Sequence, residues 1–385
     1  MIGFSRVKRM ATMAGIALLA GCQIVPKTTA PDTPPVVSRP APEPSATALP
    51  SDATRHRVAL LVPLSGANGA VGQSIANATT MALLDTNADN IRITTYDTAT
   101  GPRNAASRAI NDGNALILGP LLADNVPSVL AEARGARVPL ISFSNDATVA
   151  SPDAFVMGHV PEESVAATVR FARSRGSGNF AALVPDGAYG QRAEAALNSA
   201  LRTYGGNLVA TERYARGNTS VVSAAQRIKQ RGGYDAVLVA DGARLAARAA
   251  ETLKPGDVQL LGTELLSGES NVTRTPAMRG MLFSAVPDQR FKRFSDSYNS
   301  RFGGQPYRIS TLGYDAVLLA LRVARDWDVG DRFPTRALLD EGGFLGLDGA
   351  FRFQRNGVVE RAMEVREIRD GRVVIIQPAP ARFDD

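Results

Sequence analysis

Short apolar runs alternate with longer segments of helical character, and this alternation limits the possible folds more than any other feature of the chain. The apolar runs lie at residues 58–62, 91–96, 115–118 and 138–142, with helical patterns at 72–84, 105–111 and 126–134. Most of these runs are apolar throughout, which is typical of parallel strands covered by helices on both faces. The pattern therefore predicts a doubly wound α/β lobe.

The same alternation begins again after Gly158. Strands are expected at 180–184, 208–214, 236–239 and 258–261, and helices at 163–174, 193–204, 221–231 and 244–253. After residue 284 the pattern is less regular and predicts helices at 291–302 and 311–327 and a hairpin of 350–353 with 362–368. The 385 residues suit two units of ~150 residues. We therefore expect two successive α/β lobes, with the late segments completing one or both.

The N-terminal residues have the character of an export signal. Arg6, Lys8 and Arg9 precede an uncharged stretch, residues 10–21. As a helix this stretch reaches ~18 Å, which is too short for a ~30 Å hydrocarbon core. We therefore expect residues 1–21 to be a signal peptide rather than a permanent membrane span.

The signal ends in Leu-Ala-Gly-Cys at residues 19–22, and Cys22 is the sole cysteine of the chain. This stretch resembles a bacterial lipobox, which implies that Cys22 is lipidated and becomes the mature N-terminus. The alternative is an ordinary cleaved signal with an incidental cysteine. Gln23 replaces the Asp that retains enterobacterial lipoproteins in the inner membrane, so the resemblance favours the outer membrane. Acyl chains contribute ~0.8 kcal/mol per buried CH2 to membrane anchoring.

A tether is expected between this anchor and the folded domain, over residues 22–54. Residues 23–54 contain eight Pro and no aromatic residue. Such a segment buries too little apolar surface to offset the entropy of ordering it. It is therefore expected to be a disordered, semi-extended spacer.

The composition excludes several classes of function. One Cys and two His, His56 and His159, exclude a disulfide framework, a four-cysteine zinc site and a three-histidine metal centre. The formal charge of +6 includes three cations of the signal, and what remains is too small to indicate nucleic acid binding. No hydrolase motif occurs in a fitting context. We expect a protein that is not an enzyme, with no metal, no cofactor and no nucleic-acid partner.

Polar side chains follow four of the expected strands. Ser65 follows the first strand, Ser144, Asn145 and Asp146 follow the fourth, and Tyr189 and Glu264 follow two strands of the second lobe. Ligands of open parallel sheets bind at the carboxyl ends of strands, so these six residues are candidates for a cleft between the lobes. Each of them alone is also consistent with a turn or a helix cap. The loop after the first strand matches neither nucleotide-binding glycine motif.

The order of several stretches resembles the type I periplasmic binding fold, in its branch related to branched-chain amino-acid receptors. These stretches are 58–72 with Val-Pro-Leu-Ser-Gly, 117–121, 138–142, 186–190 with Tyr-Gly, and 313–320. The resemblance covers roughly residues 55–370 and implies two lobes joined by three crossovers. It places the first lobe at about 56–157 and 286–335, the second at about 158–285 and 336–370, and a tail at 371–385.

Within that fold the chain is similar to the C-terminal domain of the LpoA-like penicillin-binding protein activator lipoproteins. The similarity lies in Leu-Gly-Pro-Leu-Leu-Ala-Asp-Asn-Val at 118–126 and in 71–78, together with the lipobox and the tether. It implies a periplasmic, lipid-anchored protein that contacts a cell-wall synthase and supports peptidoglycan synthesis. Long members of that group carry a helical-repeat domain before this one, whereas here only the tether precedes Arg55.

The resemblance to amino-acid receptors implies a second possibility, the receptor of an ABC importer that works with a membrane permease. Glu264 matches the acid that accepts the ligand ammonium, and Tyr189 matches the aromatic residue over the ligand. The carboxylate half of the site matches less well. Ala123 offers no side-chain donor, and Asp146 repels a carboxylate by ~4 kcal/mol at ~4 Å and a dielectric of ~20. The expected ligand is an amino acid or related amine, a neutral molecule, or none.

Overall fold

The computed structural model describes residues 54–217, 219–253 and 258–383. The expected signal peptide, the tether up to residue 53 and Cys22 lie outside the described residues. Among the helices that are described, none combines the length and the apolar character of a membrane span.

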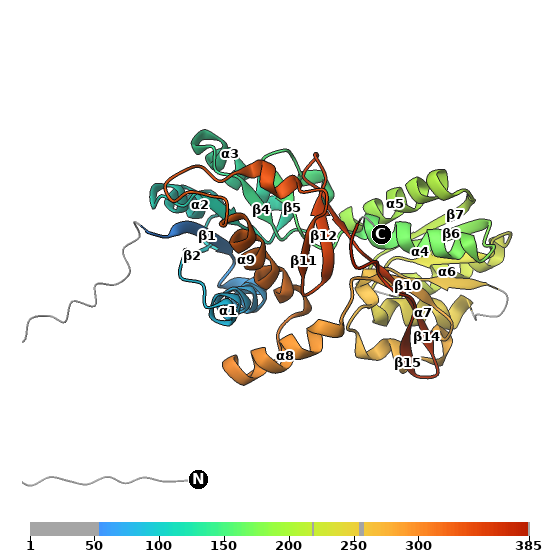
Figure 1. The fold of residues 1–385 in the computed structure, drawn as a ribbon. Coiled ribbons are helices and arrows are strands. Elements are labelled where there is room, and N and C mark those ends of the chain that lie inside the picture. The colour runs from blue at the N-terminus through green and yellow to red at the C-terminus, as the bar shows by residue number, and fades with distance from the viewer. Residues whose placement is uncertain (1–53, 218, 254–257, 384–385) are drawn as a thin grey trace, which may run out of the picture. The chain divides into compact units, whose positions relative to one another are not determined.

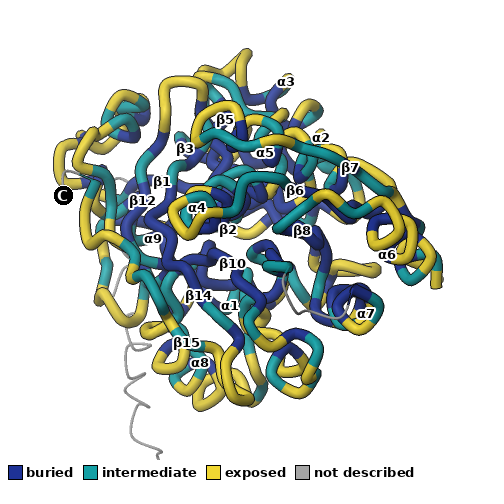
Figure 2. Tube along the Cα trace, turned by 90° about the vertical axis from the view of Figure 1, so that its right-hand side faces the viewer, coloured by how far each residue is buried: buried dark blue, intermediate teal, exposed yellow. Residues whose placement is uncertain are grey.

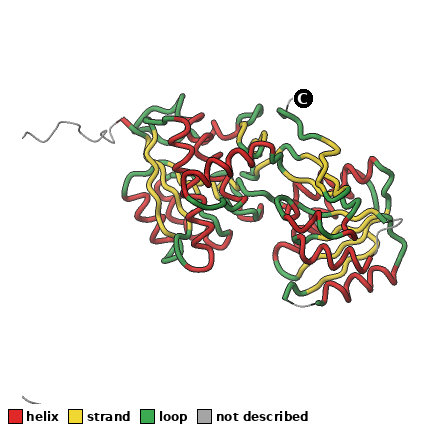
Figure 3. Tube along the Cα trace, turned by 90° about the horizontal axis from the view of Figure 1, so that it is seen from below, coloured by secondary structure: helices red, strands yellow, loops and turns green. Residues whose placement is uncertain are grey.

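The first sheet is entirely parallel and has the strand order β2-β1-β3-β4-β5. Its strands are β1 (His56–Val62), β2 (Ile91–Asp97), β3 (Leu116–Leu118), β4 (Leu140–Ser142) and β5 (Ala154–Val156). Every residue of β1 except Arg57 is buried, as expected for a strand covered on both faces. Figure 1 shows these strands with α1 and α9 beside them, and Figure 3 shows helices flanking the strands.

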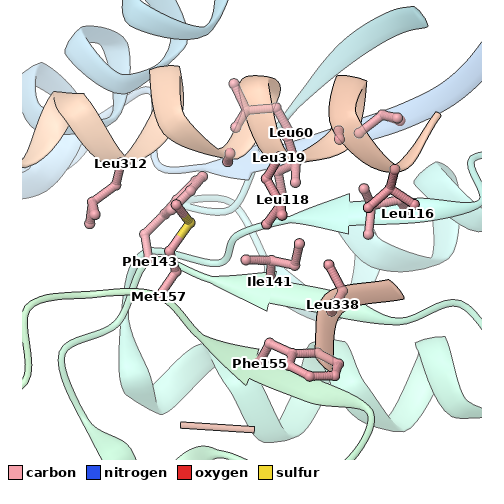
Figure 4. Packing of buried hydrophobic residues seen from close by; sticks show 14 of the residues in the cluster. Leu60, Leu116, Leu118, Ile141, Phe143, Phe155, Met157, Leu312, Leu319 and Leu338 are labelled. Carbon is pink, nitrogen blue, oxygen red and sulfur yellow. The ribbon is translucent and has the colours of Figure 1, made fainter. Parts of the chain in front are cut away.

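Separate apolar clusters cover the two faces of this sheet. On one face, α1 (Gly69–Thr86) and α9 (Thr311–Val323) pack with strand side chains such as Leu60, Leu118 and Ile141 (Figure 4). On the other face, α2 (Pro102–Asn111) and α3 (Val126–Ala136) pack small residues against Ala59 and Leu61. Helices on both faces confirm the doubly wound lobe expected from the sequence.

The second sheet has the order β15-β14-β10-β9-β8-β6-β7. Its strands are β6 (Asn179–Pro185), β7 (Asn207–Tyr214), β8 (Ala236–Val239), β9 (Gln259–Leu261), β10 (Leu282–Ala285), β14 (Glu364–Arg369) and β15 (Arg372–Gln377). Helices α4 (Pro161–Ser174) and α5 (Ala188–Tyr204) cover one face, and α6 (Ser220–Arg231) and α7 (Ala243–Leu253) cover the other. The parallel strands from β7 to β10 repeat the order of the first sheet. Figure 2 shows the strands largely buried and many outer helical turns exposed.

The chain passes three times between the two sheets: after β5, after β10 and after β13. The second passage leads to α8 (Gln289–Phe302) and α9, whose buried residues join the first lobe. The third follows a small antiparallel sheet of β11 (Phe344–Gly346), β12 (Gly349–Phe353) and β13 (Val359–Arg361). Phe351 and Phe353 of β12 lie in the first core.

The late strands differ from the expected assignment. The sequence predicts that residues 336–370 belong to the second lobe, but of this range only β14 pairs into the second sheet. The expected hairpin of 350–353 with 362–368 does not form, because β12 pairs with β13 and β14 pairs with β10 and β15. The expected tail, 371–385, contains β15. A strand's own pattern specifies its buried face but not its partner strand, which explains these differences.

In each lobe, a glycine places the helix that follows the first strand close against the end of that strand. A Cβ on Gly72 would lie 1.7 Å from the carbonyl oxygen of Pro63, and one on Gly190 would lie 1.8 Å from that of Pro185. Both contacts occur where the first strand of a lobe turns into its helix. Because only glycine allows this approach, the loop that carries Tyr189 is held at the carboxyl edge of the second sheet.

Candidate functional site

The structure brings five of the six predicted residues into two neighbouring loop groups and leaves Ser65 apart. Ser65 is exposed, and its hydroxyl lies 3.4 Å from Asp97 Oδ2 at the end of β2. Asp97 also accepts the Leu64 N–H at 2.9 Å, so this loop is held within the first lobe. Ser65 therefore acts as part of a local turn in this structure.

Tyr189 and Glu264 are in direct contact. The Tyr189 hydroxyl donates to Glu264 Oε1 at 2.9 Å and lies 2.9 Å from the hydroxyl of Thr263, which is fully buried. Tyr189 lies in the first turn of α5, and Thr263 and Glu264 follow β9, so the carboxyl ends of β6 and β9 carry this group. The sequence anticipated both positions from their place after strands.

Glu264 keeps one oxygen without a partner. Oε1 accepts from Tyr189, whereas Oε2 is buried and has no hydrogen bond. Burial raises the pKa of Glu264 to about 7, although the hydrogen bond from Tyr189 lowers it. Burial also raises the pKa of Glu162, at the start of α4, and its Oε2 is buried without a partner too. Two buried carboxyls therefore face this region, each with an unsatisfied oxygen.

Arg192 connects this group to the loop after β4 in the first lobe. It lies three residues after Tyr189 on α5, and its Nη1 donates to the carbonyl oxygen of Asn145. Its Nε lies 3.7 Å from Asp146 Oδ1, and both side chains are largely buried. The guanidinium also lies 6.0 Å from the centre of the Tyr189 ring. Arg192 thus places a positive charge between the predicted residues of the two lobes.

The polar groups after β4 are occupied within their own loop. The Asp146 N–H donates to the Ser144 hydroxyl at 3.0 Å, and the Asp146 carboxylate accepts the Thr148 N–H at 3.0 Å as a cap. Asn145 is exposed, and its backbone carbonyl accepts the hydrogen bond from Arg192. The Ser144 hydroxyl thus accepts a backbone N–H of its own loop, and the Asp146 carboxylate serves as a local cap.

A small cavity of about 40 Å³ lies beside Glu264. Its lining residues come from both lobes and the connections between them: His159, Glu264, Ser267, Ala285, Val286, Arg308 and Met363. Pockets for small-molecule ligands typically measure ~300–1,000 Å³. A cavity of this size has room for a few water molecules.

A buried ionic cluster, two of whose members line this cavity, was not anticipated from the sequence. Asp348, fully buried, accepts from Arg308 Nη1 at 2.7 Å and from the Thr311 hydroxyl at 2.8 Å, and lies 2.8 Å from His159 Nε2. Burial lowers the pKa of His159, although Asp348 raises it. Arg308 keeps a buried Nη2 without a partner. No spacing signal links these residues, since 189 positions separate His159 from Asp348.

Arg192 was also missed, although a signal for it existed. The sequence predicts this helix only from residue 193, whereas α5 begins at Ala188. An earlier start would have placed Tyr189 and Arg192 three positions apart on one helix face. Among the described residues, no group of three or more His, Cys, Asp or Glu is arranged to hold a metal ion.

Over residues 56–372 the chain matches the model of a family described as periplasmic binding protein. An uncharacterized protein of Rickettsia prowazekii is 25% identical over 174 residues, which is 44% of this chain and 46% of that protein. The match thus spans about half the length of this curated relative.

Solved structures of two kinds share the fold. A putative branched-chain amino acid ABC transporter from Rhodospirillum rubrum has a TM-score of 0.73 at 20% identity, over 84% of this chain and 100% of that one. The C-domain of LpoA from Haemophilus influenzae, described as a regulator of PBP1A, has a TM-score of 0.65 at 19% identity, over 83% and 99%. Full-length LpoA from the same organism gives 0.65 at 20% identity, with 84% of this chain but 59% of LpoA covered. At these identities the similarity establishes the fold alone.

Proposed function

The chain belongs to the periplasmic binding protein family over residues 56–372, and on that basis we propose that it is a non-enzymatic periplasmic lipoprotein that contacts a penicillin-binding protein and supports peptidoglycan synthesis. The likeness to the LpoA C-domain, a regulator of PBP1A in Haemophilus influenzae, supports this role. In open α/β sheets, ligands bind beside the loops at the carboxyl ends of the strands. Whether those loops leave room for a ligand therefore helps to distinguish a solute receptor from a regulator.

The state of the site at Glu264 carries the proposal. The chain itself supplies part of what a ligand amine would provide, because Tyr189 donates to one carboxylate oxygen and the Arg192 cation lowers the pKa of Glu264. Arg192 also bonds the loop after β4, and the adjoining cavity of about 40 Å³ is far smaller than a typical ligand pocket of ~300–1,000 Å³. A protein that regulates a partner through its surface needs no empty pocket here.

The membrane anchor belongs to the same proposal. Lipidation of Cys22 would hold the domain on a bilayer through a spacer of about thirty residues, and Gln23 favours the outer membrane. A Pro-rich spacer reaches ~3.1 Å per residue when extended, which would let the domain reach away from the membrane that anchors it.

Crosslinking in native envelopes tests the proposal. The full-length tagged chain is crosslinked in cells, the envelope is solubilised, and captured proteins are probed with fluorescent penicillin and by mass spectrometry. Recovery of a penicillin-labelled synthase, competed by untagged chain, supports the role. Recovery of permease subunits without any synthase would contradict it.

The alternative function is the receptor of an ABC importer for amino acids or related amines. The unpartnered Glu264 Oε2 beside a cavity favours it, because a buried carboxylate oxygen without a donor suits a ligand ammonium. Thermal-shift screening with amino acids, polyamines and muropeptides separates the two functions. A ligand that stabilises the parent and the matched variant Glu269→Gln, but not Glu264→Gln, would establish the receptor. Glu269 is the control because it is exposed and lies on the same loop.

A further inference from the structure

Strand β15 forms a free edge of the second sheet. It pairs with β14 on one side, and among the described residues no strand pairs with its other side. Figure 1 shows β14 and β15 side by side. Its sequence, Arg-Val-Val-Ile-Ile-Gln, contains four consecutive β-branched apolar residues and one charge. Natural proteins usually shorten, charge or cover such an edge, because it is a template for pairing with another strand.

The apolar side chains of this edge are accessible. Val373 and Ile375 are 36% and 39% exposed, and both lie on the same face because strand side chains alternate. Val374 and Ile376, on the other face, are partly buried, and Ile376 packs against the cluster beneath α4 and α5. The strand is therefore anchored to its lobe while its outer edge stays open.

The hairpin that precedes β15 determines which backbone groups point outward. Asp370 and Gly371 both have positive φ, +50° and +71°, and form the two-residue turn between Arg369 and Arg372. In such a hairpin the residues that flank the turn form a hydrogen-bonded pair, and the pattern then alternates. The alternation holds as far as Ile375, beyond which the register with β14 shifts by one residue. The N–H and C=O groups of Val373 and Ile375 therefore point away from β14, toward the open edge.

We propose that this edge pairs with β15 of a second copy of the chain, in an antiparallel arrangement about a twofold axis. The Pro-rich stretch at residues 23–54 is unsuited to the edge, because its eight Pro lack the N–H that a strand ladder requires. A twofold dimer uses the same patch on both copies, so the strand must be complementary to itself.

The strand meets that requirement in one register. With Val374 opposite Val374 of the second copy, Val373 of each copy lies opposite Ile375 of the other. The outward N–H and C=O groups of these residues then form two hydrogen-bonded pairs, related by the twofold axis. The exposed apolar side chains of Val373 and Ile375 then cover each other on one face. Arg372 faces Ile376 of the second copy, so the two arginines lie at opposite ends of the pairing and do not repel.

Sedimentation velocity of the full chain carrying Cys22→Ser, over a range of concentrations, tests the dimer. We expect a monomer–dimer equilibrium. Ile375→Lys should raise the dissociation constant of the dimer at least tenfold, because the introduced charge would be buried against apolar partners. The matched control is Leu84→Lys, since Leu84 is an exposed apolar residue on α1, 64% exposed. A monomer at every concentration, or equal loss in both variants, would overturn the proposal.

Cysteine crosslinking tests the register even if Ile375→Lys fails to fold. In a non-hydrogen-bonded antiparallel pair the Cα atoms lie ~4.5 Å apart, within the 4.4–6.8 Å that a disulfide spans. Val374→Cys in the Cys22→Ser background is therefore expected to form disulfide-linked dimers under mild oxidation. Val373→Cys is not expected to form them, because residue 373 of one copy lies two positions away from residue 373 of the other. Equal crosslinking of both, or crosslinking of Val374→Cys to a different envelope protein instead, would contradict the pairing with a second copy.

Discussion

Replacing Glu264 with Gln is expected to remove the part of the loss of folding stability at rising pH that the buried Glu264 carboxyl causes. Burial raises the pKa of the folded-state carboxyl from 4.5 to about 7. Because the folded state then binds the proton more tightly than the unfolded state, stability is fully present below pH 4.5 and falls as the pH rises through 7. At ~1.4 kcal/mol per pH unit, the parent should lose about 2–3 kcal/mol relative to Glu264→Gln between pH 5 and pH 8.

Urea unfolding at both pH values and constant ionic strength measures this difference. Burial also raises the pKa of Glu163 and of Asp315 to about 7, so the parent's own pH curve combines several groups. The difference between parent and variant isolates Glu264, since the amide keeps the acceptor for Tyr189. Glu269→Gln, on the exposed part of the same loop, should follow the parent at both pH values. Parallel curves for the parent and Glu264→Gln would refute the assignment of a buried carboxyl.

Three further outcomes follow from contacts and sequence described above. Asp348→Asn should lower the free energy of unfolding in urea by about 3–5 kcal/mol, because it leaves buried cations unpaired. The control Asp296→Asn removes an exposed ion pair and should change that free energy by about 1 kcal/mol or less. Equal effects of the two substitutions would contradict the argument. Gly190→Ala should cost roughly 1–3 kcal/mol or more, because its Cβ would meet the Pro185 carbonyl, while Gly217→Ala meets no atom within 4 Å and should cost less. Mass spectrometry of the native protein should find acyl chains on Cys22, and an unmodified or missing Cys22 would refute the anchor.

The family and the two-lobed α/β fold expected from the sequence are confirmed. The fold could be predicted because the composition of each single strand already indicates it. Runs such as 58–62 are apolar throughout, and only strands covered on both faces need that composition. The assignment of the late strands was less successful, because three-residue strands such as β11 and β13 carry too little pattern to indicate which core they join.

For the candidate site too, the sequence indicated some positions correctly and missed others. Tyr189 and Glu264 could be placed at one sheet edge because each follows a strand, and they are hydrogen-bonded in the structure. Their role toward a ligand stays a prediction. Ser65 follows a strand too, yet it contacts Asp97 instead, since a polar residue after a strand also serves a turn. Asp348 and Arg308 meet across 40 positions, and no local signal in the chain indicates such a pair.

The three passages of the chain between the sheets have a consequence for how the protein folds as its chain is made. Neither half is a contiguous stretch of sequence: Phe351 and Phe353 complete one interior, and β14 and β15 complete the other sheet. A chain that emerges from its N-terminus onward therefore cannot close either half until its last forty or so residues have arrived. No single cleavage point would release an intact half, and premature termination within this stretch is expected to leave both halves open to proteolysis.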